Sequence, residues 1–102
     1  MQSEKKLFGE LDVSVPELKT EDYLFMRYKA LVVQHEDVCK DYYPNLTKKV
    51  MNERACKQEF PFPCFRLDKS QKSPYFVHIS ELAVCINQRH ETAKKDYATF
   101  HR

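Results

Sequence analysis

Two short basic segments hold the residues of this chain that are best suited to contact a polyanion. The first is Leu46–Lys57, where three lysines and one arginine stand against a single acid, Glu53. The second covers residues 66–72, with three basic side chains against Asp68. Lysine and arginine neutralise phosphates, and an amide such as that of Asn52 can form two hydrogen bonds with an adenine edge. These residue types therefore predict a nucleic-acid contact, although the net charge of the chain is only +2.

The first basic segment is predicted to be an amphipathic helix. At about 100° per residue, its apolar residues fall within one half of the helical wheel: Leu46, Val50, Met51 and Ala55. The opposite half holds Lys48, Lys49, Asn52, Glu53 and Cys56. The first half can be buried while the second half faces outward. The alternative is an ordinary solvated helix, because most amphipathic helices bind nothing through their polar face.

A β-hairpin is predicted to follow this helix. Pro61 and Pro63 end the helix, and Cys64–Leu67 and Tyr75–Ile79 have the composition of two short strands. Asp68–Pro74 has no large apolar side chain and is predicted to form the turn. An isolated hairpin is marginally stable in water, so it must pack against the helices. The alternative is a plain surface hairpin whose lysines only keep it soluble.

The segments before the basic helix are predicted to complete a helix-turn-helix. Glu36–Tyr43 has the composition of a short helix, and Pro44 ends it, leaving a turn of two or three residues. Asn45 or Thr47 can cap the basic helix. Tyr23–Val33 is strongly apolar and must enter the core. Its residues favour a strand, Thr20-Glu-Asp before it favours a helix, and the periodicity does not decide between them.

A long helix of about 22 residues is predicted at the C-terminal end, with Ser80 as its N-cap. One stripe of this helix is apolar and contains Leu82, Ile86, Ala93, Tyr97 and Phe100. We expect its first half to pack on the hairpin. Its second half is expected to pack on the N-terminal segment or on another subunit.

The length of 102 residues predicts one α+β domain over residues 21–102, preceded by an extension over residues 1–20 that can be flexible. The order helix, helix, hairpin, long helix predicts a small winged helix-turn-helix with a two-stranded wing. No segment resembles a secretory signal or a membrane span, so a cytosolic location is the default expectation.

The cysteines and histidines are not expected to form a metal site or a catalytic site. Cys39, Cys56, Cys64 and Cys85 contain no C-x-x-C pair, and His35 with Cys39 supplies only two ligands on one helix face. We expect the cysteines to be buried as small hydrophobic residues. The chain has one glycine and none of the common catalytic motifs, so neither an enzyme activity nor a cofactor is expected.

Six segments between Leu24 and Asp96 carry a resemblance: LFMRY, EDVCKDYY, LT before the basic helix, FPFPCFR, SQKS and VHISELAVCINQRHETAKKD. Through these segments the chain resembles the pyocin activator protein PrtN family. The resemblance implies a DNA-binding transcription activator of phage-derived genes in a bacterial or phage-infected cell. The element order is also similar to excisionase and MerR-type winged helix domains. The family tends to carry glycine at the end of the second helix, where this chain has Gln58.

The predicted partner is double-stranded DNA, with RNA polymerase or a recombinase as further partners and a homodimer or side-by-side assembly as possible states. An alternative function is a recombination directionality factor (excisionase) that bends DNA. A further alternative is a small protein-interaction module that inhibits a host factor. The predicted DNA-binding residues are Lys48, Lys49, Asn52, Glu53, Lys57, Arg66, Lys69, Gln71 and Lys72.

Overall fold

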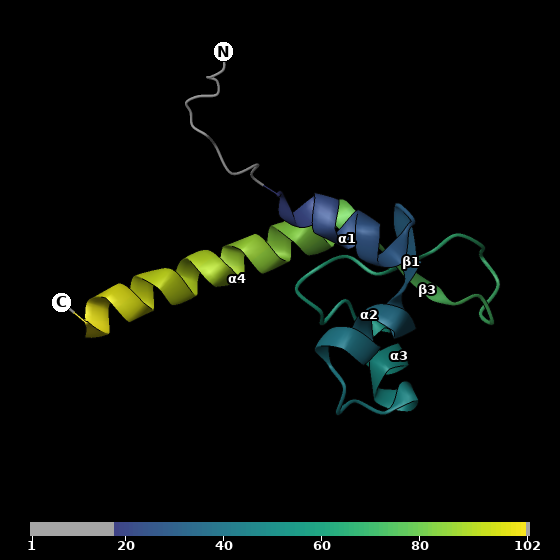
Figure 1. Ribbon diagram of the computed structural model, residues 1–102. Helices are drawn as coiled ribbons and strands as arrows, with labels where there is room; N and C mark the ends of the chain where they lie inside the picture. The colour runs from purple at the N-terminus through teal and green to yellow at the C-terminus, as the bar shows by residue number, and fades with distance from the viewer. Residues whose placement is uncertain (1–17, 102) are drawn as a thin grey trace, which may run out of the picture.

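The computed structural model describes residues 18–101 (Figure 1). Along the chain these residues form α1 (Thr20–Tyr28), β1 (Val32–Gln34), α2 (His35–Tyr42), α3 (Lys48–Cys56), β2 (Phe65–Arg66), β3 (Tyr75–His78) and α4 (Ile79–Phe100). The described part is therefore α+β, as predicted, and it ends in the predicted long helix. Residues 1–17 of the predicted N-terminal extension lie outside the described residues.

The hairpin forms, but it belongs to a larger sheet than predicted. β2 pairs antiparallel with β3, with Phe65 opposite Phe76. β1 pairs antiparallel with the other edge of β3, with Val33 opposite Val77. The sheet order is thus β1–β3–β2, and the prediction of a two-stranded unit missed its third strand. Because Val33 and Val77 are buried, β1 ties the hairpin to the core.

The apolar segment Tyr23–Val33 is a helix followed by a strand, so neither prediction for it is correct alone. Lys29 ends α1 in the left-handed conformation, with φ of 56°, and its N–H donates to the carbonyl oxygen of Phe25 at 2.6 Å. This residue turns the chain toward β1. Leu24 is fully buried, whereas Phe25 and Met26 remain about half exposed.

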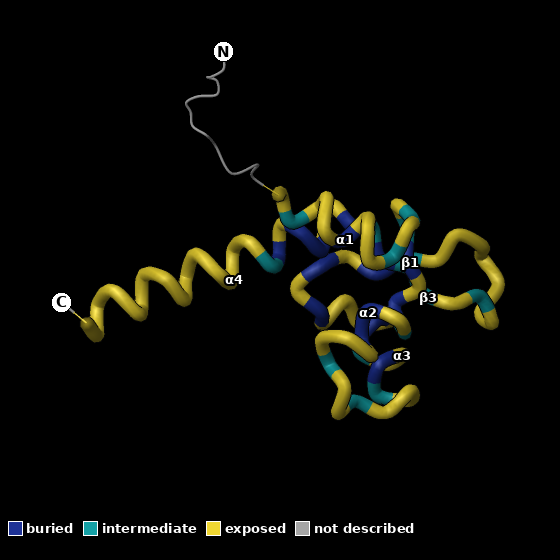
Figure 2. Tube along the Cα trace, viewed as in Figure 1, coloured by how far each residue is buried: buried dark blue, intermediate teal, exposed yellow. Residues whose placement is uncertain are grey.

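The first half of α4 lies against both α1 and β3 (Figure 2). Packing on the hairpin was predicted, but packing on α1 was not. The hydroxyl group of Thr20 donates to the side-chain oxygen of Asn87 at 2.6 Å and fastens the two helices. Leu24, Val38 and Val77 are fully buried and bring α1, α2 and the sheet into one core.

The start of α4 differs from the prediction. The N-cap is His78, whose ring Nδ1 accepts a hydrogen bond from the N–H of Ser80 at 3.1 Å, so Ser80 is already in the first turn. Residues 87–100 are all exposed, and Figure 2 shows this part of the helix extending away from the other elements. None of the described helices is long and apolar enough to cross a membrane.

Three of the four cysteines are buried as predicted, and Cys56 is exposed on α3. Burial raises the pKa of both Cys39 and Cys64 to about 11, so these thiols are protonated at neutral pH. The Sγ of Cys39 lies 3.3 Å from Nε2 of His35, as expected for residues four apart on a helix. Within residues 18–101, no group of three possible metal ligands comes together.

Candidate nucleic-acid interface

The basic segment forms α3 with the two faces that the helical wheel predicts. The hydroxyl oxygen of Thr47 accepts from the N–H of Val50 at 3.2 Å, which makes Thr47 the N-cap. Met51 and Ala55 are buried, and Leu46 and Val50 are partly buried. The opposite face is exposed and carries Lys48, Lys49, Asn52, Glu53 and Cys56. Tyr43–Thr47 joins α2 to α3, so the turn has five residues rather than the two or three predicted.

The exit from α3 is held by an alternating aromatic and proline segment. Phe60 and Phe62 are buried and stack with their ring centroids 5.5 Å apart, while Pro61 and Pro63 face outward. Gln58 has a left-handed backbone, with φ of 55°. This conformation explains why a glycine suits the position, since glycine adopts it without a steric penalty.

The side chain of Gln58 forms two hydrogen bonds that offset the steric penalty of its left-handed backbone. Its amide nitrogen donates to the carbonyl oxygen of Cys64 at 2.8 Å, and its amide oxygen accepts from the N–H of Cys64 at 3.3 Å. These two bonds satisfy the backbone of Cys64 just before β2 begins. They also fix the distance between the end of α3 and the hairpin.

Arg54 belongs to the basic segment but lies on the core side of it. Its guanidinium carbon is 4.7 Å from the ring centroid of Phe60 and 5.9 Å from that of Tyr43. A cation over aromatic faces stabilises packing, and here it covers the aromatic cluster. The positive surface of α3 therefore comes from its lysines.

The exposed side chain of Arg66 stiffens the hairpin. Its Nε donates to the carbonyl oxygen of Ser73 at 3.2 Å, and its guanidinium group lies over the ring of Tyr75, 4.3 Å from the centroid. The N–H of Ser73 donates to the carbonyl oxygen of Ser70 at 3.0 Å and closes the turn at the tip. Lys69 and Lys72 are exposed in this turn.

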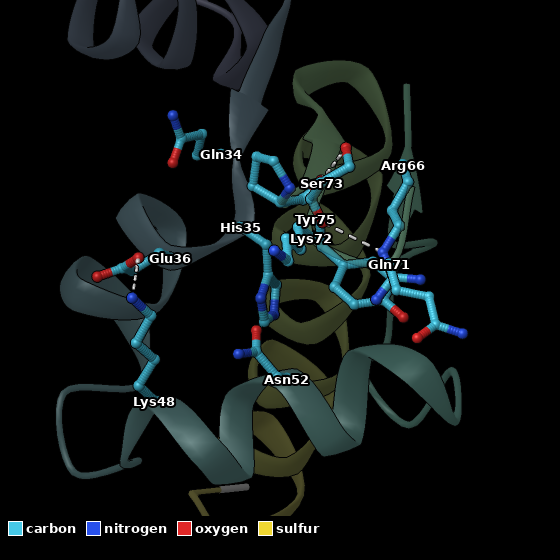
Figure 3. Close-up of a pocket in the computed structure, with 11 residues that line it drawn as sticks. Gln34, His35, Glu36, Lys48, Asn52, Arg66, Gln71, Lys72, Ser73 and Tyr75 are labelled. Carbon is cyan, nitrogen blue, oxygen red and sulfur yellow. Dashed lines mark hydrogen bonds and ion pairs between the residues drawn. The ribbon is translucent and has the colours of Figure 1, made fainter. Parts of the chain in front are cut away.

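The polar face of α3 and the hairpin line one hollow of about 490 Å³ (Figure 3). Lys48 and Asn52 contribute from α3, and Arg66, Gln71 and Lys72 contribute from the hairpin. The first residues of α2 lie between them, with His35 close to Asn52 in the figure. The two basic segments of the sequence thus face the same side of the molecule.

The hollow contains five of the nine predicted DNA-binding residues. The remaining four are exposed beside it: Lys49, Glu53 and Lys57 on or just after α3, and Lys69 at the hairpin tip. Sequence reasoning missed the lining residues from β1 and α2, namely Gln34, His35 and Glu36, and also Ser73, Pro74 and Tyr75. No local pattern marks Gln34, His35 and Glu36 as lining residues, because only the packing of α2 against α3 brings them to the hollow.

The hollow is positive but contains one acid. Lys48, Arg66 and Lys72 stand against Glu36, whose carboxylate oxygen is 4.0 Å from the Nζ of Lys48. Both side chains of this ion pair are well exposed, so it stabilises the fold very little. Burial lowers the pKa of His35 below its ordinary value, so this imidazole is neutral at pH 7.

Comparison with protein families gives one match. The family model described as pyocin activator protein PrtN matches residues 20–93, which extend from the start of α1 into the exposed part of α4. The matched range includes α3, the hairpin and the hollow between them. The searches of curated proteins and of solved structures gave no match. The chain belongs to the pyocin activator protein PrtN family.

Proposed function

We propose that this protein is a sequence-specific DNA-binding activator of phage-derived genes that uses a winged helix-turn-helix. In this proposal α2, the turn and α3 are the helix-turn-helix, and the β2–β3 hairpin is the wing. The main support is that Lys48 and Asn52 of α3 face the same hollow as Arg66 and Lys72 of the hairpin. Membership of the pyocin activator family supports a regulatory role. The protein would act by binding, without catalysis or a cofactor, in the bacterial cytoplasm.

α3 is the element that would enter the major groove, because the groove accepts one helix. Asn52 would contact a base edge, since its amide is exposed between Lys48 and the hairpin. Lys48, Lys49 and Lys57 would contact phosphates along the helix, with Glu53 at the groove between them. Arg66, Lys69, Gln71 and Lys72 would contact the backbone or the minor groove beside it.

Fluorescence anisotropy with a random-sequence duplex at low salt tests this proposal. We expect micromolar binding that weakens with salt, because non-specific affinity comes from counterion release. Lys48→Ala with Lys49→Ala should weaken binding to every duplex and reduce the log–log salt slope by about 1.8. Unchanged affinity in that variant, or no binding by the wild type at low salt, would contradict the proposal and favour a protein-interaction module.

The role on DNA is tested by footprinting on phage-derived promoters and on integrase attachment sites. An activator protects a site at a promoter, whereas a recombination directionality factor protects tandem sites and bends them. We expect the promoter footprint, because the family is described as an activator. Tandem footprints beside an attachment site alone would replace the activator with the excisionase role.

A further inference from the structure

The exposed part of α4 carries a stripe with strict four-three spacing that is apolar except at His90. The stripe begins inside the core with Ile79 and Ala83 and continues through Ile86, His90, Ala93, Tyr97 and Phe100. Alternating steps of four and three residues are the pattern by which one helix packs along another. Ile86 is partly buried, whereas Tyr97 is 66% and Phe100 is 85% exposed.

The exposed part of α4, residues 87–100, is too short to be a stable single helix in water. Isolated helices shorter than about 12–15 residues are marginal, and most helical stability in proteins comes from packing an apolar face. Residues 87–100 are all exposed, so this part of α4 buries no apolar face against the other described residues. The spacing of the stripe therefore suits a partner that presents a matching helix.

We propose that the partner is a second copy of this chain, which pairs antiparallel with α4 through Ile86–Phe100. The position of the globular part excludes the parallel arrangement. Ile79 and Ala83 face the core, so the globular part lies on the same side of α4 as the exposed stripe. Parallel helices would bring two globular parts to the same place, whereas antiparallel helices carry them to opposite ends.

The side chains also match in the antiparallel orientation. With His90 opposite Ala93 of the partner subunit, the large imidazole meets a small residue, and Tyr97 meets Ile86 of the partner subunit. Arg89 and Asp96 lie on one flank of the stripe, and in this register each Arg89 faces Asp96 of the partner subunit. Parallel helices would instead place Arg89 opposite Lys94 of the partner subunit, which is a like-charge contact.

The pairing is small, so the dimer should be weak. Two short helices bury less than the roughly 1,200–2,000 Å² of standard interfaces, and we expect a dissociation constant on the order of 10 µM. Phe100 would lie at each end of the pairing, against the rim of the partner's globular part. This proposal does not depend on DNA binding, and its test contains no DNA.

Sedimentation of the full chain over a range of about 1–200 µM tests the proposal, since the range brackets the expected dissociation constant. The average mass should rise from 12.2 kDa toward twice that value. Tyr97→Glu with Phe100→Glu should remain monomeric and folded, because both rings are exposed in the single chain. Lys95→Glu, on the opposite side of α4, is the matched control and should still dimerise.

Charge reversal tests the orientation. Arg89→Asp and Asp96→Arg should each weaken the dimer about tenfold, and the two together should restore it. A wild-type chain that stays monomeric at the highest concentration would overturn the proposal and indicate that the stripe is covered by the same chain or by another protein. A dimer that survives the Tyr97 and Phe100 changes would overturn this interface. Failure of the double reversal to restore the dimer would overturn the antiparallel register.

Discussion

Removing Lys48 and Lys72 together tests whether α3 and the hairpin act as one surface. The two lysines come from different elements and line the same hollow. If each contacts a phosphate, Lys48→Ala with Lys72→Ala lowers the salt slope by about 1.8. If the variant and the wild type bind equally at 1 M salt, this slope difference makes the variant bind about 60-fold more weakly at 0.1 M salt.

Anisotropy titrations at several salt concentrations between 50 and 200 mM measure the slope directly. Over that fourfold range the wild-type affinity should fall about 12-fold more than the affinity of the double variant. The matched control is Lys40→Ala with Lys95→Ala, which removes the same charge from exposed positions outside the hollow. Lys40 instead lines a second hollow beside Arg27 and Asp41.

The control separates local contact from net charge. If both double variants lose the same affinity and slope, the lysines act only through total charge, and the reasoning from the hollow is refuted. If only Lys48→Ala weakens binding and Lys72→Ala does not, α3 contacts DNA without the hairpin. Circular dichroism of each variant checks that the fold is intact.

Three further changes have expected outcomes. Glu36→Gln should tighten binding at low salt several-fold, because it removes the carboxylate 4.0 Å from Lys48 Nζ, and weaker binding in the same anisotropy assay would be evidence against a phosphate there. His35 has a folded-state pKa below its ordinary 6.5, so denaturant titrations should show the unfolding free energy falling as pH drops below about 6.5. His35→Leu should make the unfolding free energy depend less on pH. If the unfolding free energy of this variant depends on pH as steeply as that of the wild type, other groups cause the dependence. Lys29→Gly should raise the unfolding free energy by about 0.5–1 kcal/mol by relieving the left-handed backbone, whereas a lower value in chemical denaturation would show that the lysine conformation carries little strain.

The sequence predicted best where local periodicity decides the structure. The faces of α3 follow from the spacing of Val50, Met51 and Ala55, and burial in the structure agrees with them. The hairpin followed from the polar turn between two apolar segments. The sequence therefore placed the nine candidate residues on these two elements, and the structure brings five of the nine to one hollow.

The remaining features depend on contacts between distant segments. β1 is only three residues long and is a strand because β3 pairs with it, which no local pattern in Tyr23–Val33 reveals. Packing of α1 on α4 joins Thr20 to Asn87 across the whole fold. The N-cap of α4 is His78 rather than Ser80, because the imidazole Nδ1 of His78 accepts from the N–H of Ser80 and the helix begins earlier than predicted.

Amide NMR spectra of the full chain, recorded while a duplex is added, test most directly the claim that α3 and the wing form one DNA-binding surface. We expect the largest chemical-shift changes to occur at residues 48–57 and 69–73 together. Changes confined to one of these segments, or concentrated around Arg27 and Asp41 on the second hollow, would contradict it.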